Sequence, residues 1–233
     1  MVCLPSADVA EIVAGAGFDW AWLDTEHTAS SEETCQRMLQ ALGPSCAGLI
    51  RVAENRDHLI KRALETGCEG VIVPQVRTAA EAIDAVASCR YPPSGRRSVG
   101  AGRAHAWGRG FDEYVARAND ELCVVLQAEH VDAVRNIEAI VRVEGIGAVL
   151  VGPYDLSASL GIPGRVDDPR VLEAIGVVRD ACRKAAVPAG IFAGDAARAR
   201  RWRSEGFQLI GMGTDIGYLC GALDGALAAF RAR

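Results

Sequence analysis

LCVVLQAEHVDAVRNIEAIVRVEGIGAVLVGPYDLSASLG, residues 122–161, has the clearest pattern in this chain. Two apolar runs of strand length, Leu122–Leu126 and Ala148–Val151, enclose a segment of helical period, and this order predicts a βαβ unit. An acidic residue follows each run: Glu129 follows the first and Asp155 the second. Because neighbouring parallel strands end at the same edge of a sheet, the two carboxylates can meet around one cation. For an isolated unit, two solvated loop acids are an equally good interpretation.

The turn after the second apolar run could also bind an anion. Gly152 and Pro153 make it sharp, which leaves the backbone N–H groups near Tyr154 and Asp155 free to bind an anion. We therefore assign these four residues to substrate binding, and we expect Asp155 to bind the metal as well.

The same alternation of apolar runs and helix-period segments extends along the chain. It indicates parallel strands joined by right-handed crossovers. The expected strands are Val2–Leu4, Trp20–Leu23, Ala47–Val52, Val71–Val73, the two runs above, Ala189–Phe192 and Leu209–Met212. The expected helices are Ala7–Ala16, Glu32–Leu42, Asp57–Thr66, Ala79–Cys89, Asp112–Asn119, the segment inside the βαβ unit, Pro169–Ala186, Ala196–Glu205 and Tyr218–Arg231. Residues 91–110 look irregular.

Eight strand–helix pairs predict an α/β protein with the (β/α)8 TIM-barrel fold, as a single domain over residues 1–233. An open doubly wound sheet is the alternative. In a barrel the chemistry takes place at the carboxyl ends of the strands, so the residues that follow each strand decide the function.

The composition argues against several classes of partner. The net charge of -5 argues against nucleic-acid binding, and no window of ~18 consecutive apolar residues indicates a membrane span. The eight cysteines contain no CxxC pair, which is typical of reduced core thiols. We therefore expect a cytoplasmic protein that binds neither nucleic acid nor a membrane.

The polar residues at the predicted strand ends suit enolate chemistry. A divalent cation bound by Glu129 and Asp155 would act as a Lewis acid on the oxygens of a 2-oxo acid. Arg51 could stabilise the charge of the enolate, and His27, oriented by Asp24, could act as the general base. Ordinary roles stay open for the last three: a structural ion pair for the arginine, a turn position for the histidine and a helix cap for the aspartate.

Lysine usage separates two kinds of aldol chemistry. A Schiff-base mechanism needs a lysine inside the barrel. The chain contains only Lys61 and Lys184, and both fall in predicted helices of the outer ring. The sequence therefore favours metal-assisted chemistry.

Five segments that together span nearly the whole chain carry a resemblance to a known family. They are AGAGFDWAWLDTEHT, GCEGVIVPQVRTAAEA, YPPSGRRSVG, ANDELCVVLQAEH and VGPYDLSASLG. With these motifs the chain resembles the class II pyruvate-dependent aldolases, which include 4-hydroxy-2-oxoheptanedioate aldolase and 2-dehydro-3-deoxyglucarate aldolase. Macrophomate synthase and the citrate lyase β chain are more distant relatives.

The resemblance implies a (β/α)8 barrel that uses Mg2+ or Mn2+, with Co2+ as a further candidate, held by Glu129 and Asp155. It implies that pyruvate, a 2-oxo acid, binds to Arg51 and to backbone amides near Tyr154 and Asp155. Gln127 matches the glutamine that the family places beside the metal ligands.

For proton transfer the resemblance implies an acid–base pair of Asp24 and His27. It also implies a homo-oligomer, a dimer or a hexamer of dimers, whose subunits exchange the last helix. Residues 218–231 are apolar enough for that exchange.

Several residues depart from the pattern of the family. His130 stands where threonine is common, Tyr154 stands where the residue is often small, and the loop Ile162–Asp168 is short. The chain also starts almost at its first strand, at Met1–Pro5. These departures change the rim that meets the second substrate. Three interpretations stay open: an aldolase, which we prefer; a Claisen-type synthase that condenses oxaloacetate with acetyl-CoA; and a barrel without catalysis.

Overall fold

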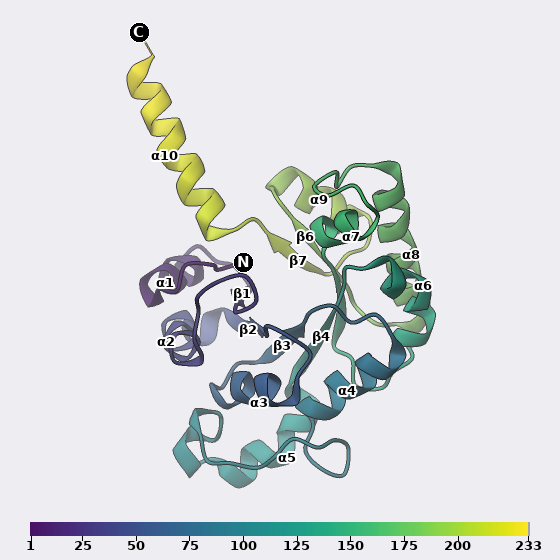
Figure 1. Cartoon of the computed structure of the whole chain (residues 1–233). Coiled ribbons are helices and arrows are strands. Elements are labelled where there is room, and N and C mark those ends of the chain that lie inside the picture. Colours follow the sequence, from purple (N-terminus) through teal and green to yellow (C-terminus); the bar gives the residue numbers. More distant parts are fainter. Residues whose placement is uncertain (233) are drawn as a thin grey trace.

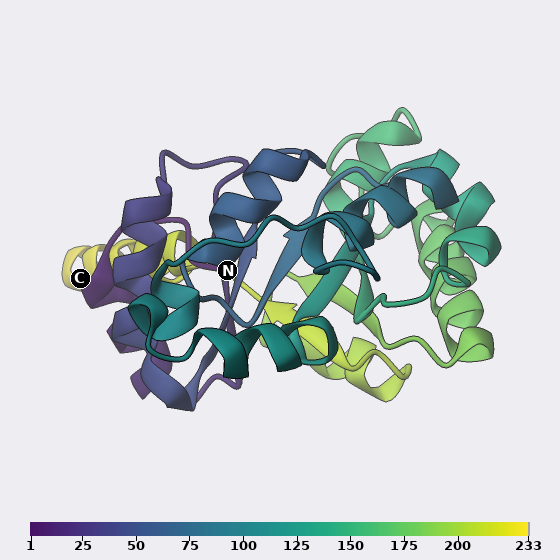
Figure 2. The ribbon, with the colours of Figure 1, turned by 90° about the horizontal axis from the view of Figure 1, so that it is seen from below.

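Within residues 1–232, the part of the chain that the computed structural model describes, seven parallel strands form one sheet that curves nearly into a barrel (Figure 1). Each strand pairs with the next one in chain order, from β1 to β7. Helices surround the strands, which Figure 2 shows in the middle of the molecule. The strands are β1 (Trp20–Asp24), β2 (Ala47–Arg51), β3 (Gly70–Val73), β4 (Cys123–Ala128), β5 (Ala148–Val151), β6 (Ala189–Ala193) and β7 (Leu209–Met212).

The helices follow the predicted segments closely. They are α1 (Ala7–Gly15), α2 (Glu32–Leu42), α3 (Asp57–Glu65), α4 (Ala79–Cys89), α5 (Phe111–Glu121), α6 (Val131–Ile140), α7 (Pro153–Ser159), α8 (Pro169–Ala185), α9 (Ala196–Ser204) and α10 (Asp215–Arg231), with short 3-10 helices η1 (Gly43–Ser45) and η2 (Arg103–Gly108). Side-chain caps explain several of the helix starts. Ser31, Thr78 and Asp195 each accept a hydrogen bond from the backbone N–H three residues later.

The N-terminal segment takes the place of the first predicted strand. The sequence predicted the remnant of a short first strand at Val2–Leu4. In the structure Val2 forms only an isolated parallel bridge with Leu23, so the described sheet has seven strands rather than the predicted eight. The N-terminal segment also contacts the residues that follow β7. The Met1 amino group donates to the Gly213 carbonyl over 3.0 Å, and the Asp215 N–H donates to the Met1 carbonyl over 3.1 Å. The segment therefore spans the gap between β1 and β7. The sequential strand order also rules out the open doubly wound sheet.

Side chains alternate between the two faces of the barrel wall. The larger cluster of buried residues fills the space between the strands and the outer helices. The smaller one fills the interior, and its buried members are Trp22, Leu49, Ile72, Val125, Ala148 and Leu150. Trp22, Leu49 and Val125 are each followed two positions later by a polar residue on the same inward face. These polar residues are Asp24, Arg51 and Gln127. The period of the strands thus places these polar residues at the mouth of the barrel.

One helix was not predicted. We expected a tight turn at residues 152–155, but Gly152 precedes α7 and Pro153 is its first residue. Proline suits this position because its missing N–H would have no partner inside the helix and its φ is already helical. Tyr154 and Asp155 consequently lie in the first turn of α7.

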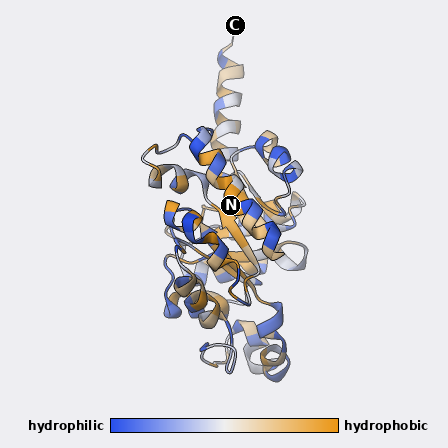
Figure 3. Cartoon of the chain, turned by 90° about the vertical axis from the view of Figure 1, so that its right-hand side faces the viewer, coloured by the Kyte–Doolittle hydropathy of each residue, from blue (hydrophilic) through white to orange (hydrophobic). Residues whose placement is uncertain are grey.

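All eight cysteines, which lie in the described part of the chain, are free, as the sequence predicted. Between residues 1 and 232 no helix is both long and apolar enough to cross a membrane. The last helix, α10, extends away from the hydrophobic strands (Figures 1 and 3), and none of its described residues is buried.

Candidate active site

Arg51 is a buried cation at the mouth of the barrel, and two carboxylates hold it. Its Nε lies 2.8 Å from Asp24 Oδ1, and its Nη1 lies 3.0 Å from Glu26 Oε2. Arg51 and Asp24 are 3% and 1% exposed. The strand register explains the first contact, because β1 and β2 pair Asp24 directly with Arg51. The arginine is therefore fixed in position before any substrate arrives.

Further contacts restrict the guanidinium of Arg51. Its Cζ lies 4.7 Å from the centre of the Trp22 ring, and Nη2 lies 3.9 Å from Met1 Sδ. Burial lowers the pKa of Arg51, but the hydrogen bond to Asp24 and the charges of Asp24 and Glu26 outweigh it, so the pKa is raised. Arg51 is therefore a permanent positive charge at neutral pH.

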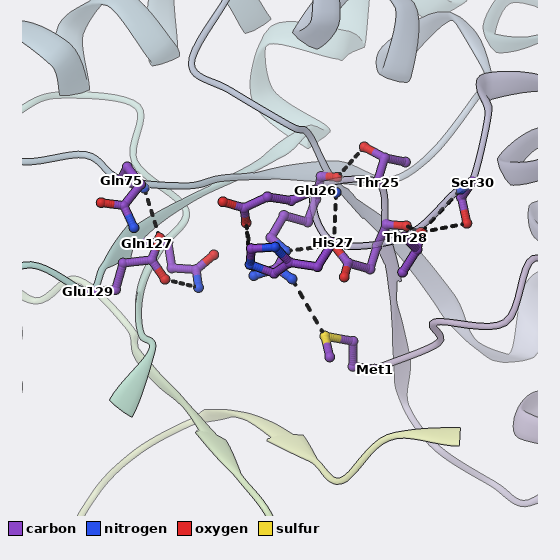
Figure 4. Close-up of polar contacts among 11 residues, drawn as sticks. Met1, Thr25, Glu26, His27, Thr28, Ser30, Gln75, Gln127 and Glu129 are labelled. Carbon is purple, nitrogen blue, oxygen red and sulfur yellow. Dashed lines mark hydrogen bonds and ion pairs between the residues drawn. The ribbon is translucent and has the colours of Figure 1, made fainter. Parts of the chain in front are cut away.

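His27 lies beside Glu26, and among the described residues no hydrogen bond or ion pair joins it directly to Asp24, so the pairing of Asp24 with His27 stays a prediction. Its Nε2 is 3.7 Å from Glu26 Oε2, and its side chain is 60% exposed (Figure 4). Asp24 Oδ1 instead accepts hydrogen bonds from Arg51 and from the Glu26 N–H, 3.1 Å away. Asp24 is the last residue of β1 and points inward, whereas His27 lies in the turn that follows. Glu26, to which the sequence gave us no reason to assign a role, connects His27 to Arg51.

Glu129 is also buried, at 1% exposure, and lies among amide groups. Its Oε1 accepts a hydrogen bond from the Gln75 N–H over 3.0 Å, and its Oε2 accepts one from Gln127 Nε2 (Figure 4). Gln75 has a φ of 55°, which is unusual for a residue with a side chain and turns its N–H toward the carboxylate. The position of Gln75 at the end of β3 is visible in the sequence, but its backbone conformation is not.

Gly152 lies against Glu129 and Gln127. A Cβ atom at Gly152 would lie 2.6 Å from Glu129 Oε2, closer than real Cβ contacts, and 3.0 Å from Gln127 Nε2, tighter than nearly all of them. Glycine is thus required here by the close approach of the backbone rather than by its own φ. The predicted substrate-binding turn and the predicted metal ligand Glu129 are therefore direct neighbours.

The pKa of Glu129 shows that the charged groups of the mouth act on one another. It is raised to about 8, first by burial and then by the charges of Asp155 and Glu26, while the Gln75 N–H and Arg51 lower it. Burial likewise raises the pKa of Glu26, against the opposing effects of Arg51 and His27. Glu26, Glu129 and Asp155, which follow β1, β4 and β5, thus share one electrostatic environment.

Oxygen donors of this kind suit a hard divalent cation. Glu129 and Asp155 supply two carboxylates, and Gln127 Oε1 and Asp24 Oδ2 are buried oxygens without a hydrogen-bond partner. Among residues 1–232 no group of three or more histidine, cysteine, aspartate or glutamate side chains is arranged to hold a metal. The donors present fit a cation that is held by two carboxylates and completed by substrate and water.

Tyr154 is the exposed member of the substrate-binding turn. Pro153 is buried, but Tyr154 is 51% exposed, and its ring centre lies 6.3 Å from that of Phe192 on β6. His130, which the sequence placed directly after Glu129, caps α6 and accepts a hydrogen bond from the Asp132 N–H. Lys61 and Lys184 lie on the outer helices α3 and α8, as predicted, so no lysine reaches the mouth from the described strands.

Comparison with known proteins identifies the family. The family model described as HpcH/HpaI aldolase/citrate lyase matches residues 2–222. The chain is 41% identical over 229 residues to a 2-keto-3-deoxy-L-rhamnonate aldolase of Klebsiella pneumoniae, covering 97% of this chain and 85% of that protein. A protein of the same name from Salmonella gallinarum is 40% identical over 226 residues, covering 96% of this chain and 84% of that protein.

Solved structures of this family are also similar to the chain. The crystal structure of an HpcH/HpaI aldolase/citrate lyase family protein from Burkholderia cenocepacia has a TM-score of 0.95 at 35% identity, covering 99% of this chain and 93% of that one. The structure of citrate synthase SbnG has a TM-score of 0.88 at 27% identity, covering 99% and 91% of the two chains.

These similarities confirm the predicted family and the predicted enzyme class, and they favour an enzyme over a barrel without catalysis. Members of the family depend on a divalent metal. The chain belongs to the HpcH/HpaI aldolase/citrate lyase family and is one of its carbon–carbon lyases.

Proposed function

We propose that this enzyme is a class II aldolase that cleaves a 2-oxo-acid aldol through the enolate of pyruvate. In the cleavage direction the C3–C4 bond of the substrate breaks, its electrons form the enolate, and the C4 hydroxyl loses its proton as the aldehyde leaves. The observation that supports this most is the buried guanidinium of Arg51 beside Glu129 and its neighbours. A fixed positive charge at this place stabilises an enolate oxygen and needs no reorganisation during the reaction.

Binding of the 2-oxo acid falls to the residues that surround Arg51 and Glu129. Arg51 has donors on a planar fork that suits a carboxylate or an enolate oxygen. We assign Gln127 to orientation, because its Nε2 already holds Glu129. The turn of Gly152, Pro153, Tyr154 and Asp155 brings the backbone close to the same carboxylate, since Gly152 has no side chain to prevent it.

Glu129 and Asp155 would hold the divalent metal, with Mg2+ and Mn2+ as the first candidates and Co2+ as a further one. When bound there, such a cation supplies Lewis acidity to the oxygens of the 2-oxo acid. Two carboxylates in a partly buried site give the negative charge that the cation needs.

Proton transfer is assigned to His27. Its exposed ring at the rim can reach a proton on the substrate, and its neighbour Glu26 can stabilise the imidazolium that forms. Asp24, the partner that the sequence indicated for His27, also holds Arg51 in place.

The relatives suggest a 2-keto-3-deoxy sugar acid as the substrate. The direct test is to incubate the purified enzyme with 2-keto-3-deoxy-L-rhamnonate and Mg2+ or Mn2+ and to measure the release of pyruvate. A second measurement follows exchange of the C3 protons of pyruvate in D2O, which reports enolate formation without an aldehyde. Absence of both activities, with each metal, would contradict the proposal.

The similarity to citrate synthase SbnG makes a Claisen-type condensation the second candidate. The same enolate machinery could join oxaloacetate and acetyl-CoA. Release of free CoA from that mixture, together with no pyruvate release from the sugar acid, would favour this alternative. The enolate site would then be correct and the acceptor different.

We also propose that the whole chain, residues 1–233, acts as one barrel domain within a homo-oligomer that exchanges α10. Apolar side chains of α10 are exposed along one stripe, at Ile216, Leu219, Leu223, Leu227 and Phe230. A mostly apolar groove of about 400 Å³ lies between α1 and the edge strands, lined by residues such as Val9, Val13, Phe18 and Ile210. The stripe of a second subunit would fill this groove, where the last helix of a barrel normally packs.

A further inference from the structure

Gln75 is the residue whose backbone holds one oxygen of Glu129. Its N–H donates to Glu129 Oε1 over 3.0 Å (Figure 4), and the φ of Gln75 is 55°. A residue with a Cβ atom rarely adopts this left-handed conformation, so other contacts have to hold it there. Whatever fixes the torsion of Gln75 therefore also fixes one of the two carboxylates that we assign to the metal.

The backbone on both sides of Gln75 is anchored. Its direct neighbours Pro74 and Val76 are buried. One residue further on, the Arg77 carbonyl accepts a hydrogen bond from Asn136 Nδ2 over 2.9 Å. Asn136 belongs to α6, the helix that follows β4, so this bond joins the turn after β3 to the next element of the barrel. These anchors keep the turn in place and leave the side chain of Gln75 as the part that needs a partner.

Arg77 is the partner of the Gln75 side chain. Its Nη2 donates to Gln75 Oε1 over 3.0 Å, and both side chains are half-buried. A cavity of about 710 Å³ is lined by both residues, so packing alone does not fix the amide on that side. The backbone N–H of Arg77 donates to Glu81 Oε2 over 2.7 Å, which fixes the base of the arginine at the start of α4. The hydrogen bond from Arg77 to Gln75 thus connects an anchored residue to a strained one.

We propose that Arg77 is a positioning residue for the metal, and that it acts through the side chain of Gln75 on the left-handed backbone whose N–H orients Glu129. This inference rests on the proposed aldolase function and adds a residue that touches neither the metal nor the substrate. Groups that orient a metal ligand typically strengthen metal binding ~10–100-fold. Here the orientation passes through a backbone torsion.

The charge of Arg77 allows a competing role in binding the substrate. Its guanidinium lines the cavity and could bind an anionic group of the aldehyde. In that role Arg77 would affect KM for the aldehyde and would leave the affinity for the metal unchanged. The two roles are separated by a measurement of metal binding in the absence of any substrate.

The test measures the dissociation constant of Mn2+ with the full-length, metal-free enzyme, from the electron paramagnetic resonance signal of the free ion. Arg77→Ala should raise this constant ~10-fold or more. Arg56→Ala is the matched control, because Arg56 lines the same cavity but forms an exposed pair with Glu54 at 3.3 Å. The control should bind Mn2+ like the wild type. Equal losses in both variants would show that a positive charge near the mouth, and not the contact with Gln75, is what matters.

Two variants of Gln75 test whether the torsion carries the effect. Gln75→Ala removes the amide but keeps a Cβ atom, so it should weaken Mn2+ binding about as much as Arg77→Ala. Gln75→Gly also removes the amide, but glycine adopts a positive φ without steric cost, so it should bind Mn2+ more tightly than Gln75→Ala. Adding Arg77→Ala to Gln75→Gly should have no further effect, because the arginine then has no side chain to hold.

Proton exchange of pyruvate in D2O completes the test. At saturating Mn2+, Arg77→Ala should recover most of the wild-type exchange rate, since its defect lies in metal affinity. Wild-type Mn2+ affinity in Arg77→Ala, or equal affinities of Gln75→Ala and Gln75→Gly, would overturn the inference alone. A rise in KM for the aldehyde with unchanged Mn2+ binding would assign Arg77 to the substrate instead. If the wild type does not bind Mn2+, or if Glu129→Gln binds it equally well, the proposed metal site is wrong and the inference fails with it.

Discussion

Arg51 Nε donates to Asp24 Oδ1 across 2.8 Å in the mouth of the barrel, and both side chains are shielded from solvent. A rim arginine in solvent could be removed at little cost to the fold. A buried one cannot, because Asp24 and Glu26 would lose their counter-ion inside the protein. The ion pair therefore contributes to the structure as well as to the chemistry.

This burial makes two separate predictions for Arg51. Arg51→Lys keeps a positive charge but loses the planar fork, so kcat/KM should fall ~100-fold or more with a modest effect on folding. Arg51→Ala should in addition lower the free energy of unfolding by ~3–5 kcal/mol, measured by urea denaturation. Arg62→Ala is the control, because Arg62 and Glu32 form an exposed pair, and its removal should cost less than ~1 kcal/mol. Equal costs for both alanine variants would show that burial is not the cause.

Gly152→Ala should inactivate the enzyme without unfolding it. The new methyl group would meet Glu129 Oε2 at 2.6 Å, so the carboxylate or the turn has to move. A displacement of this size at a reacting centre lowers kcat/KM by ~100-fold. Gly176→Ala in α8 is the matched control, because the only neighbour of the new Cβ is the end of the Arg179 side chain at 3.8 Å. That control should keep full activity; if it loses activity to the same extent, the contact with Glu129 is irrelevant.

The strand and helix pattern could be predicted from the sequence because its signals are local. The helices Glu32–Leu42 and Ala79–Cys89 and the strands Ala148–Val151 and Leu209–Met212 have the predicted boundaries. Glycine, proline and capping residues mark those boundaries, and the period of apolar residues gives the type of element. The inward face of each strand follows from the same period.

Contacts that depend on the course of the turns could not be predicted. The spacing of Asp24 and His27 suggested a pair, but β1 ends at Asp24, and His27 lies in the turn that follows, beside Glu26. Likewise Gln75 donates to Glu129 only because its φ is positive, for which its side chain gives no signal. The Gly152–Pro153 pair is typical of a turn and equally of a helix start, and this chain uses the second.

Glu129→Gln should stabilise the metal-free enzyme while removing its activity. The pKa of Glu129 is about 8 in the folded protein and near 4.5 in the unfolded chain. At a pH between these two pKa values, the unfolded chain has released the proton and the folded protein has kept it. The free energy of unfolding of the wild type therefore falls as the pH rises. Glutamine has no proton to lose at this position.

The thermal midpoints of both proteins, measured in EDTA, test this. The midpoint of Glu129→Gln should lie only slightly above that of the wild type at pH 5. The difference should increase with pH and should correspond at pH 8 to a few kcal/mol in the free energy of unfolding. Added Mg2+ or Mn2+ should then raise the midpoint of the wild type and leave the variant unchanged. Glu138→Gln, at an exposed glutamate of α6, should behave like the wild type throughout. An advantage of Glu129→Gln that does not depend on pH would contradict the assigned pKa.

The exposed stripe of α10 predicts that the subunits associate through this helix. Leu223 is 61% exposed within one subunit, so Leu223→Asp should not destabilise the barrel itself. If the stripe packs into the apolar groove of a partner, the charge becomes buried there and the oligomer dissociates. Light scattering after size-exclusion chromatography at micromolar concentration should show an oligomer for the wild type and a smaller species for Leu223→Asp. Ala228→Asp places the same charge on the other side of α10 and should leave the mass unchanged. A wild-type protein that is monomeric at these concentrations would contradict the proposed exchange of α10 between subunits.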